Sequence, residues 1–350
     1  MITYLIVAAI KSALVLFVLL TAVAYTVWLE RKVVGRMQNR WGPTRVGPFG
    51  LLQPLADGIK FILKEDLTPP HVHKSLFILA PFLSVVLALI SISIIPFGNT
   101  ISIAGQTTSL QITGALTSSG GNGDINIALL ILLGVTSIAV YGVALAGWSS
   151  NSKYSLLGSL RASAQMVSYE LSLGLSLVGV LILAGSFSLR QIVDKQAGGI
   201  LHWFIWPQMI GFFIYLISAY AETNRIPFDL PEAETELVAG YHTEYSAMKF
   251  AMFFMAEYTN MVTVACVATL LFFGGWRGPV PHQFPPILQA LTPIFWFCVK
   301  IFLFIFLYIW VRGTLPRFRY DQLMAFGWKF LLPLAIFNII LTSFWVAFIS

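Results

Sequence analysis

The chain has 350 residues, of which 57% are hydrophobic and only 10% are charged, with a formal net charge of +6. Soluble domains carry roughly 25% charged residues, so this composition excludes an ordinary soluble protein and predicts an all-α integral membrane protein. In such a chain the positions of Lys and Arg report orientation, and we expect no nucleic-acid partner. Two cysteines, Cys266 and Cys298, lie in apolar runs without C-x-x-C spacing, which argues against a disulfide framework or a sulfur-ligated cluster.

Eight apolar runs are long enough to cross a bilayer, which takes about 20 residues of α-helix. They lie at 3–29, 76–96, 125–148, 160–184, 203–221, 250–273, 290–311 and 328–348. The first run lacks a basic n-region and a small-residue cleavage site, so we expect it to remain as a span. The fifth is short and contains Pro207. Because unpaired backbone groups are not tolerated in lipid, the sequence predicts a single helical membrane domain, 1–350.

The connections between these runs alternate in charge. Sixteen of the 21 Lys and Arg residues lie in or beside the odd-numbered connections, three lie in the even-numbered ones, and two lie within spans. The positive-inside rule places the odd-numbered connections in the cytoplasm and both termini in the periplasm. Residues 97–124, rich in Gly, Ser, Thr and Asn without Lys or Arg, are then expected to form a flexible periplasmic loop.

The first cytoplasmic connection, residues 30–75, contains an amphipathic stretch at 49–64. Polar side chains recur there at helical spacing, with Leu and Ile filling the other side: Gln53, Asp57, Lys60 and Lys64. The stretch is too short and too polar to span, which predicts a helix lying in the membrane interface. It is either a surface anchor or a lip over a lateral opening for a lipid-soluble substrate.

The third cytoplasmic connection, residues 221–249, is an acidic loop that holds six of the fifteen carboxylates in the chain. They are Glu222, Asp229, Glu232, Glu234, Glu236 and Glu244. Two further acids, Glu170 and Glu257, lie within spans, about 15 Å and 10 Å from their cytoplasmic ends at 1.5 Å per helical residue.

Acids at membrane depth are costly and usually functional. Glu222, Glu257 and Glu170 therefore predict a graded proton path beneath the acidic loop. The structural alternative is that Glu170 or Glu257 pairs with Lys300, a candidate counter-ion in the seventh span.

Other site motifs carry less weight. His71 and His73 form an H-x-H pair, but the sequence offers no evident third ligand, so no metal site is predicted. The chain contains no P-loop, no dinucleotide fingerprint and no H-E-x-x-H motif, so we expect it to bind no nucleotide or flavin by itself.

Five long segments resemble the H subunit of bacterial NADH-quinone oxidoreductase (respiratory complex I), the counterpart of mitochondrial subunit 1. They are ERKVVGRMQNRWGPTRVGPFGLLQPLADGIKFILKE (30–65), GWSSNSKYSLLGSLRASAQMVSYE (147–170), AETNRIPFDLPEAETELVAGYHTEYS (221–246), FFMAEYTN (253–260) and RGTLPRFRYDQLM (312–324). The resemblance covers nearly the whole chain. Pro231, Ala233 and the long 97–124 loop depart from the expected pattern, and none of them affects the acids.

The resemblance implies a multi-pass subunit of a bacterial inner membrane that forms the quinone access tunnel and couples quinone reduction to proton translocation. Quinone would be the substrate, and this chain would bind no cofactor, because flavin and iron–sulfur clusters belong to partner subunits. The implied partners are the quinone-site and iron–sulfur subunits of the peripheral arm, neighbouring small membrane subunits, and lipids.

The same resemblance assigns roles to individual residues. The implied quinone-tunnel residues are Arg31, Arg36, Arg40, Phe49, Gln53, Asp57, Phe253 and Met255. The implied proton path consists of Glu170, Glu222 and Glu257, and the implied coupling residues of the acidic loop are Asp229, Glu232, Glu234, Glu236 and Glu244.

Three alternatives to this interpretation remain open on the sequence. A stand-alone proton or ion transporter predicts internal repeat symmetry, which the chain lacks. The membrane anchor of a related hydrogenase or ferredoxin-linked complex shares the overall bundle, although the well-formed 30–65 segment favours quinone. A purely structural scaffold is disfavoured by the intramembrane acids.

Overall fold

The bundle consists of long apolar helices, as the hydropathy pattern predicts. A computed structural model describes residues 2–98, 100–103, 106–109, 125–229, 238–279 and 286–349. Within these ranges, seven helices are long and apolar enough to cross a membrane. They are α1 (Ile2–Met37), α3 (Lys74–Ile94), α4 (Ala128–Ser149), α5 (Lys153–Ala184), α9 (Ala247–Phe272), α10 (Pro286–Thr314) and the continuous stretch of α11 (Tyr320–Phe326), the π-turn η5 (Gly327–Leu331) and α12 (Leu332–Ile349). The all-α membrane fold is confirmed.

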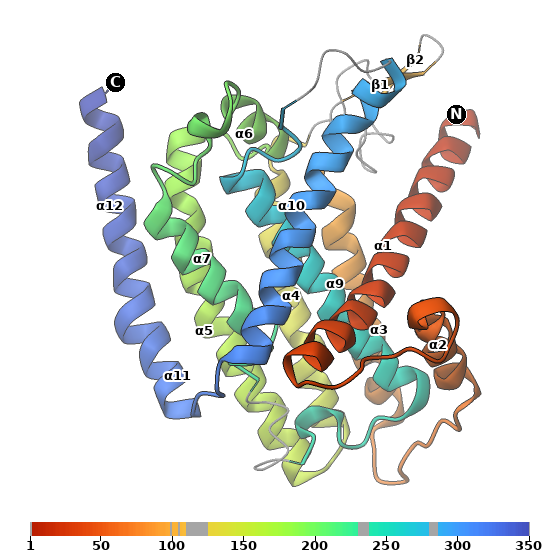
Figure 1. The fold of residues 1–350 in the computed structure, drawn as a ribbon. Coiled ribbons are helices and arrows are strands. Elements are labelled where there is room, and N and C mark those ends of the chain that lie inside the picture. Colours follow the sequence, from red (N-terminus) through yellow and green to blue (C-terminus); the bar gives the residue numbers. More distant parts are fainter. Residues whose placement is uncertain are drawn as a thin grey trace.

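Both ends of the chain lie on the same side of the bundle (Figure 1). The short helix α6 (Leu189–Lys195) and an antiparallel hairpin of β1 (Thr100–Ile103) and β2 (Gln106–Ser109) lie on that side too. The hairpin occupies part of the stretch expected to be a flexible loop. Chain ends on one side require an even number of crossings, which fits seven long helices plus α7 (Met209–Glu222) as the eighth. Which side faces the cytoplasm stays a prediction.

Three helix boundaries differ from those expected from hydropathy. Helix α1 continues beyond the apolar run to Met37, so Arg31 and Arg36 lie on the helix rather than in a loop. Helix α5 likewise begins at Lys153 rather than near 160. Charged residues such as Lys, Arg and Glu are good helix formers, so a helix can outlast its apolar run. Helix α7 begins only after Pro207 and has 14 residues, because proline is poorly tolerated inside a helix.

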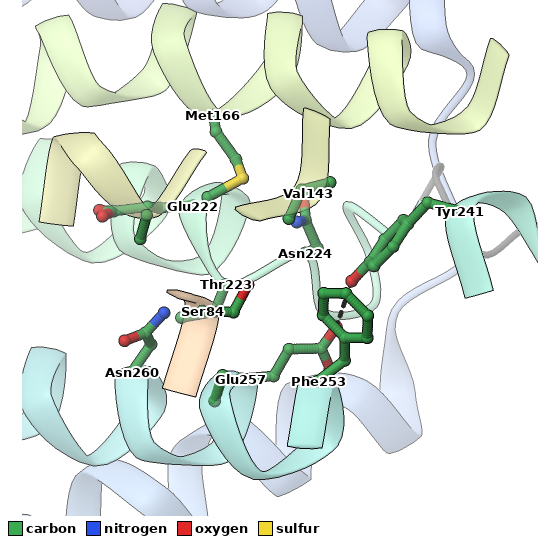
Figure 2. Close-up of a pocket in the computed structure, with 12 residues that line it drawn as sticks. Ser84, Val143, Met166, Glu222, Thr223, Asn224, Tyr241, Phe253, Glu257 and Asn260 are labelled. Carbon is green, nitrogen blue, oxygen red and sulfur yellow. Dashed lines mark hydrogen bonds between the residues drawn. The ribbon is translucent and has the colours of Figure 1, made fainter. Parts of the chain in front are cut away.

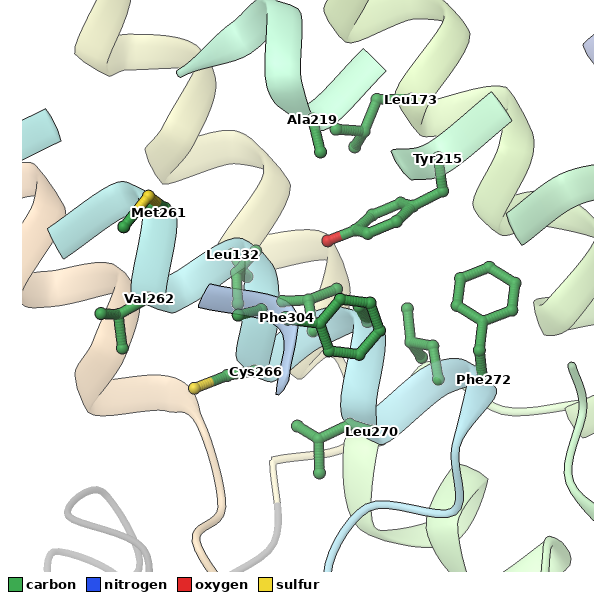
Figure 3. Packing of buried hydrophobic residues seen from close by; sticks show 14 of the residues in the cluster. Leu132, Leu173, Tyr215, Ala219, Met261, Val262, Cys266, Leu270, Phe272 and Phe304 are labelled. Atoms are coloured by element: carbon green, nitrogen blue, oxygen red, sulfur yellow. The ribbon is translucent and has the colours of Figure 1, made fainter. Parts of the chain in front are cut away.

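The core lies where α4, α5, α7, α9 and α10 meet (Figure 3). Leu132 of α4 and Leu173 of α5 pack there with Tyr215 of α7, Cys266 of α9 and Phe304 of α10. Tyr215 also donates a hydrogen bond from its hydroxyl to the Val264 carbonyl, at 2.9 Å. Because lipid is as apolar as these side chains, the close packing and such hydrogen bonds are what hold the helices together.

The amphipathic helix predicted at 49–64 is present as α2 (Gln53–Leu63), preceded by a 3₁₀ turn, η1 (Pro48–Gly50). None of its residues is buried within the chain. Its apolar side is open, with Leu55 64% exposed and Ile62 71% exposed. Helix α2 lies beside α1 and the N-terminal part of α9 (Figure 1). An uncovered apolar face on a short helix at the end of the bundle is typical of an interfacial helix.

Candidate functional site

Glu222 and Glu257 line the same narrow pocket, which we call the acid pocket (Figure 2). Glu222 is the last residue of α7, and Glu257 lies three turns into α9. The other polar residues that line the pocket are Ser84, Thr223, Asn224, Tyr241 and Asn260. The pocket has an empty volume of about 410 Å³, including space open to solvent. That is room for a few waters, which are the carriers a proton path needs between side chains.

Glu257 is held by an ion pair and a hydrogen bond. Arg225 pairs with it through Nη2 and Oε2 at 3.1 Å, and the Tyr241 hydroxyl donates to Oε1 at 2.9 Å. The Arg225 and Glu257 side chains are only 8% and 12% exposed. The Arg225 guanidinium also lies over the Tyr258 ring, 4.2 Å from its centroid. Glu257 is therefore the carboxylate of a buried ion pair rather than a lone acid.

The expected counter-ion, Lys300, is instead occupied at the other end of α9. Its ammonium donates to the carbonyls that follow the helix, those of Phe273, Gly275 and Arg277, at 2.7–2.8 Å. It also lies over the Trp203 ring, 4.4 Å from the centroid. The suggestion that Lys300 pairs with Glu170 or Glu257 is wrong. Lysine near a helix C-terminus satisfies carbonyls that have no partner within the helix.

Glu170 lies on α5, near Glu222 rather than within the acid pocket itself. Its carboxylate accepts a hydrogen bond from the Ser137 side chain of α4, and it is close enough to Glu222 for the two to interact electrostatically. Glu222 thus lines the acid pocket together with Glu257 and also interacts electrostatically with Glu170. Three acids singled out in the sequence meet in one region, with Glu222 as their common neighbour.

The start and end of the acidic loop are well anchored to the bundle. Asp229 is buried and pairs with Arg317, which follows α10, at 3.2 Å. The loop returns through the 3₁₀ turn η4 (Gly240–His242), which packs closely against Gly158 of α5. A Cβ atom added at Gly158 would lie only 2.7 Å from the Gly240 Cα. Glu244 follows this turn and is half-buried. Glu232, Glu234 and Glu236 lie outside the described residues.

Gln165 of α5 ties the two sides of the first bend of this loop together. Its amide nitrogen donates to the carbonyls of Ala221 and Phe228, both at 2.8 Å, in a fully buried position. We expect Gln165→Leu to cost about 1–3 kcal/mol, because buried carbonyl groups lose their donor. Limited proteolysis between 221 and 249 should become several-fold faster in the variant, because an unanchored bend opens more often. The same change at the exposed Gln191 is the control, and equal cleavage of both variants would contradict the anchoring role.

A second polar cluster joins α1 to the amphipathic helix. Arg31 pairs with Asp57 at 2.7 Å, and the Gln53 amide donates to the other oxygen of Asp57 at 2.9 Å. We call Arg31, Gln53 and Asp57 the mouth cluster. An open hollow of about 790 Å³, including space open to solvent, lies beside it, lined by Arg31, Gln53 and residues 40–45. The hollow is basic, and Gln53, on the polar side of α2, is the residue of that helix that lines it.

The remaining predicted tunnel residues fall in two places. Arg40 lines the hollow, and Arg36 lies over the Trp41 ring at 4.6 Å from the centroid. Phe49 precedes α2 and is 79% exposed. Phe253, in contrast, is buried and lines the acid pocket beside Tyr241 (Figure 2). Met255 is half-buried and packs in a cluster with residues of α3.

The sequence did not reveal a buried carboxylate in α1, about two turns before its C-terminus. Glu30 is 9% exposed, forms an ion pair with Arg312 of α10 and accepts a hydrogen bond from the Tyr258 hydroxyl at 2.7 Å. The one signal in the sequence was the position of Glu30 directly after an apolar run, but charges at run ends are common. Tyr241, in the turn η4, and Tyr258, in α9, were missed too, because a tyrosine has no charge that distinguishes it from ordinary packing residues.

His71 and His73 lie on the surface of the chain before α3. No group of three potential metal ligands forms among the residues that the structure describes. Nothing in the geometry raises these histidines above ordinary surface residues.

Comparisons with known proteins agree on one family. A family model described as NADH dehydrogenase matches residues 10–343. An H subunit of NADH-quinone oxidoreductase from Koribacter versatilis, numbered 2 in that organism, is 77% identical over 346 residues, 98% of this chain and 98% of its own length. The H subunit numbered 1 from Solibacter usitatus is 49% identical over 99% of this chain and 98% of its own length. The H subunit numbered 2 from Geobacter sulfurreducens is 52% identical over 97% of this chain and 96% of its own length.

Proposed function

The chain belongs to the family of NADH-quinone oxidoreductase H subunits, and from this premise we propose that it forms the membrane part of a quinone tunnel and couples quinone reduction to proton translocation. It is a multi-pass membrane subunit of an oxidoreductase complex, so it works beside other subunits. In the proposal those subunits carry flavin and iron–sulfur clusters, and this chain binds no cofactor but provides the walls of the tunnel and its acidic side chains.

The acid pocket is the observation that carries the proton half of the proposal. Glu222 and Glu257 line one small pocket, and Glu170 interacts electrostatically with Glu222. Carboxylates within a membrane bundle are energetically unfavourable, and those that are present usually belong to a path for ions or protons. Like charges held close together titrate as a coupled set, so a change at one acid shifts its neighbours. The pocket therefore has the parts of a proton relay.

The mouth cluster supports the quinone half. A quinone with an isoprenoid tail reaches the protein from the lipid, so its tunnel needs an opening at membrane level. Helix α2 has an exposed apolar face, and its polar side contributes Gln53, which together with Arg31 helps to line a basic hollow. An apolar face would guide the tail, and the basic and amide groups would orient the polar headgroup.

The acidic loop connects the two halves in this proposal. It begins at Glu222 in the acid pocket, and Asp229, Glu232, Glu234, Glu236 and Glu244 give it a charge that responds to events at its surface. The excess of basic residues in the odd-numbered connections supports a cytoplasmic position for this loop and a periplasmic position for both termini. Its partners there would be the quinone-site and iron–sulfur subunits of the peripheral arm.

The transporter and hydrogenase-anchor alternatives lose support. Both would use a similar bundle, but the near-full-length relatives carry the name of a quinone oxidoreductase subunit. The closeness of the mouth cluster to an uncovered apolar helix also favours a lipid-soluble substrate over an ion alone.

Asp57→Asn tests the quinone half. The Arg31 and Asp57 side chains are 50% and 22% exposed, so the pair adds at most about 1 kcal/mol to stability and the variant should assemble. We expect the apparent KM for quinone to rise about fivefold with little change in kcat, because α2 is no longer held to α1 and the site binds quinone less well. The measurement is NADH-driven quinone reduction in membranes that contain the complex.

Lys60→Gln is the matched control for that variant. Lys60 is 73% exposed, lies on the same helix and approaches Asp57 only at 3.6 Å, so its loss should leave the KM unchanged. If Asp57→Asn and Lys60→Gln both behave like the native protein, the mouth cluster is not part of the quinone path.

A further inference from the structure

Glu30, missed in the sequence, sits at a junction between the two regions described above. Its neighbour Arg31 points to the mouth cluster, where it pairs with Asp57 of α2. Glu30 itself points into the bundle, where it pairs with Arg312 and accepts from the Tyr258 hydroxyl. The last part of α1 thus carries adjacent opposite charges, one bound to the outer cluster and one bound to the interior.

Tyr258 continues this junction toward the acid pocket. It follows Glu257 directly on α9 and is only 4% exposed. Its hydroxyl contacts Glu30 at 2.7 Å, and its ring face contacts the Arg225 guanidinium, 4.2 Å from the centroid. A guanidinium over a tyrosine face is held by cation–π attraction, which is strongest where water is excluded. Tyr258 therefore touches a buried anion through its hydroxyl and a buried cation through its ring.

Arg225 is the residue that this contact positions. Arg225 also pairs with Glu257, at 3.1 Å, so the location of its guanidinium decides how much of that charge Glu257 experiences. A displacement of the guanidinium away from Glu257 would weaken an ion pair in a site of low dielectric, where Coulomb energies are large. Holding or releasing Arg225 is thus a direct means of changing the proton affinity of Glu257.

We propose that Tyr258 is a positioning residue that links the mouth cluster to the acid pocket: through its hydroxyl it senses Glu30 at the end of α1, and through its ring it sets the position of Arg225 against Glu257. This inference rests on the proposed function and adds a physical route to it. Movement of α1 relative to α9, which quinone passing beside α2 would cause, is transmitted along Glu30 and Tyr258 to the ion pair. The route uses side chains alone and needs no rearrangement of the helices around the acid pocket.

Tyr258→Phe tests the proposed link, because it keeps the ring under Arg225 and removes the hydroxyl that contacts Glu30. We expect the kcat of NADH-driven quinone reduction in assembled complex to fall about tenfold, the size expected for losing a hydrogen bond to a charged group. The KM for quinone should stay within about twofold of native, because the mouth cluster is intact. NADH oxidation by an artificial acceptor, normalised to flavin, measures the assembled complex.

Glu30→Gln and the double variant complete the test. Glu30→Gln keeps an acceptor for Tyr258 but removes the charge, so it measures the link even if Tyr258→Phe assembles poorly. The double variant should be no slower than the slower single variant, because both changes break one link. Tyr245→Phe is the matched control: Tyr245 is buried and shares a hydrogen bond with Ser149, at 3.3 Å, outside this network. Burial raises the pKa of Tyr245 to about 12, so its hydroxyl stays protonated throughout the assay.

Normal turnover of Tyr258→Phe, or losses in the double variant that equal the product of the two single losses, would overturn the link. A rise in KM without a change in kcat would overturn it too, because that result assigns Tyr258 to substrate binding. Glu257→Gln, assayed in parallel, separates the two levels of inference. If Glu257→Gln is impaired while Tyr258→Phe is normal, only the link fails; if Glu257→Gln is also normal, the proposed function of the acid pocket fails.

Discussion

Replacing Glu257 with glutamine is expected to reduce NADH-driven proton pumping by at least about tenfold, because a proton relay that loses a titrating group loses its throughput. Glutamine has nearly the same shape and can still accept hydrogen bonds from Tyr241 and Arg225, so the complex should assemble. Quinone reduction should fall with pumping if the two are coupled. The measurement is acidification of inverted membrane vesicles together with NADH oxidation, both normalised to flavin.

Asp194→Asn is the control for this variant. Asp194 also pairs with an arginine, Arg277, at 2.7 Å, but its side chain is 52% exposed and lies at the other end of the bundle. Removing that charge should leave pumping unchanged, because exposed pairs contribute little. Pumping at the native rate in Glu257→Gln would show that the ion pair is structural only.

Replacing Arg225 with methionine is expected to damage the protein more severely. The change leaves the carboxylate of Glu257 buried without its cation, and breaking a buried pair from one side costs about 3–5 kcal/mol. Since whole domains are stable by only about 5–15 kcal/mol, the amount of assembled complex should fall sharply. The measurement is the yield of the chain that co-purifies with flavin after mild detergent extraction.

The double variant Arg225→Met, Glu257→Met separates stability from function at this position. Replacing both members of a buried ion pair by apolar residues is often neutral for stability, so assembly should recover relative to Arg225→Met alone. Pumping should stay lost, because the relay still lacks its acid. Recovery of both assembly and pumping would show that the pair serves packing alone.

Most of the fold could be predicted from the sequence because lipid restricts the backbone so strongly. Apolar length identified the spans, and a helical repeat of polar residues identified α2, both of which the structure contains. The ends of the helices were less predictable. Helix α1 continues to Met37 because charged residues form a helix as readily as apolar ones. Hydropathy therefore predicts the end of the apolar run but not the end of the helix.

The candidate site, like the fold, could be predicted only in part from the sequence. Glu170, Glu222 and Glu257 stood out because a carboxylate in or beside an apolar run is unusual, and the structure brings them into one region. Their partners could not be found by the same signal. Lys300 looked like a counter-ion by its depth, yet carbonyls at the end of another helix hold it, and backbone groups of that kind leave no mark in a sequence.

Glu30 shows a second limit. A charge at the end of an apolar run is usually a surface residue, and only the packing of α1 against α9 and α10 reveals that Glu30 is buried between Tyr258 and Arg312. Residues separated by more than two hundred positions meet there, and composition or periodicity cannot predict such a contact. The contacts of Glu30 with Tyr258 and Arg312 therefore could not be predicted from the sequence.

The central claim is that acids of the acid pocket change protonation when quinone is reduced. Infrared difference spectroscopy of the assembled complex, reduced minus oxidised, measures this through the carbonyl stretch of protonated carboxylic acids. The account predicts a carboxylic acid band in the native complex that is lost or shifted in Glu257→Gln and in Glu222→Gln. Identical difference spectra in the native complex and in both variants would contradict it.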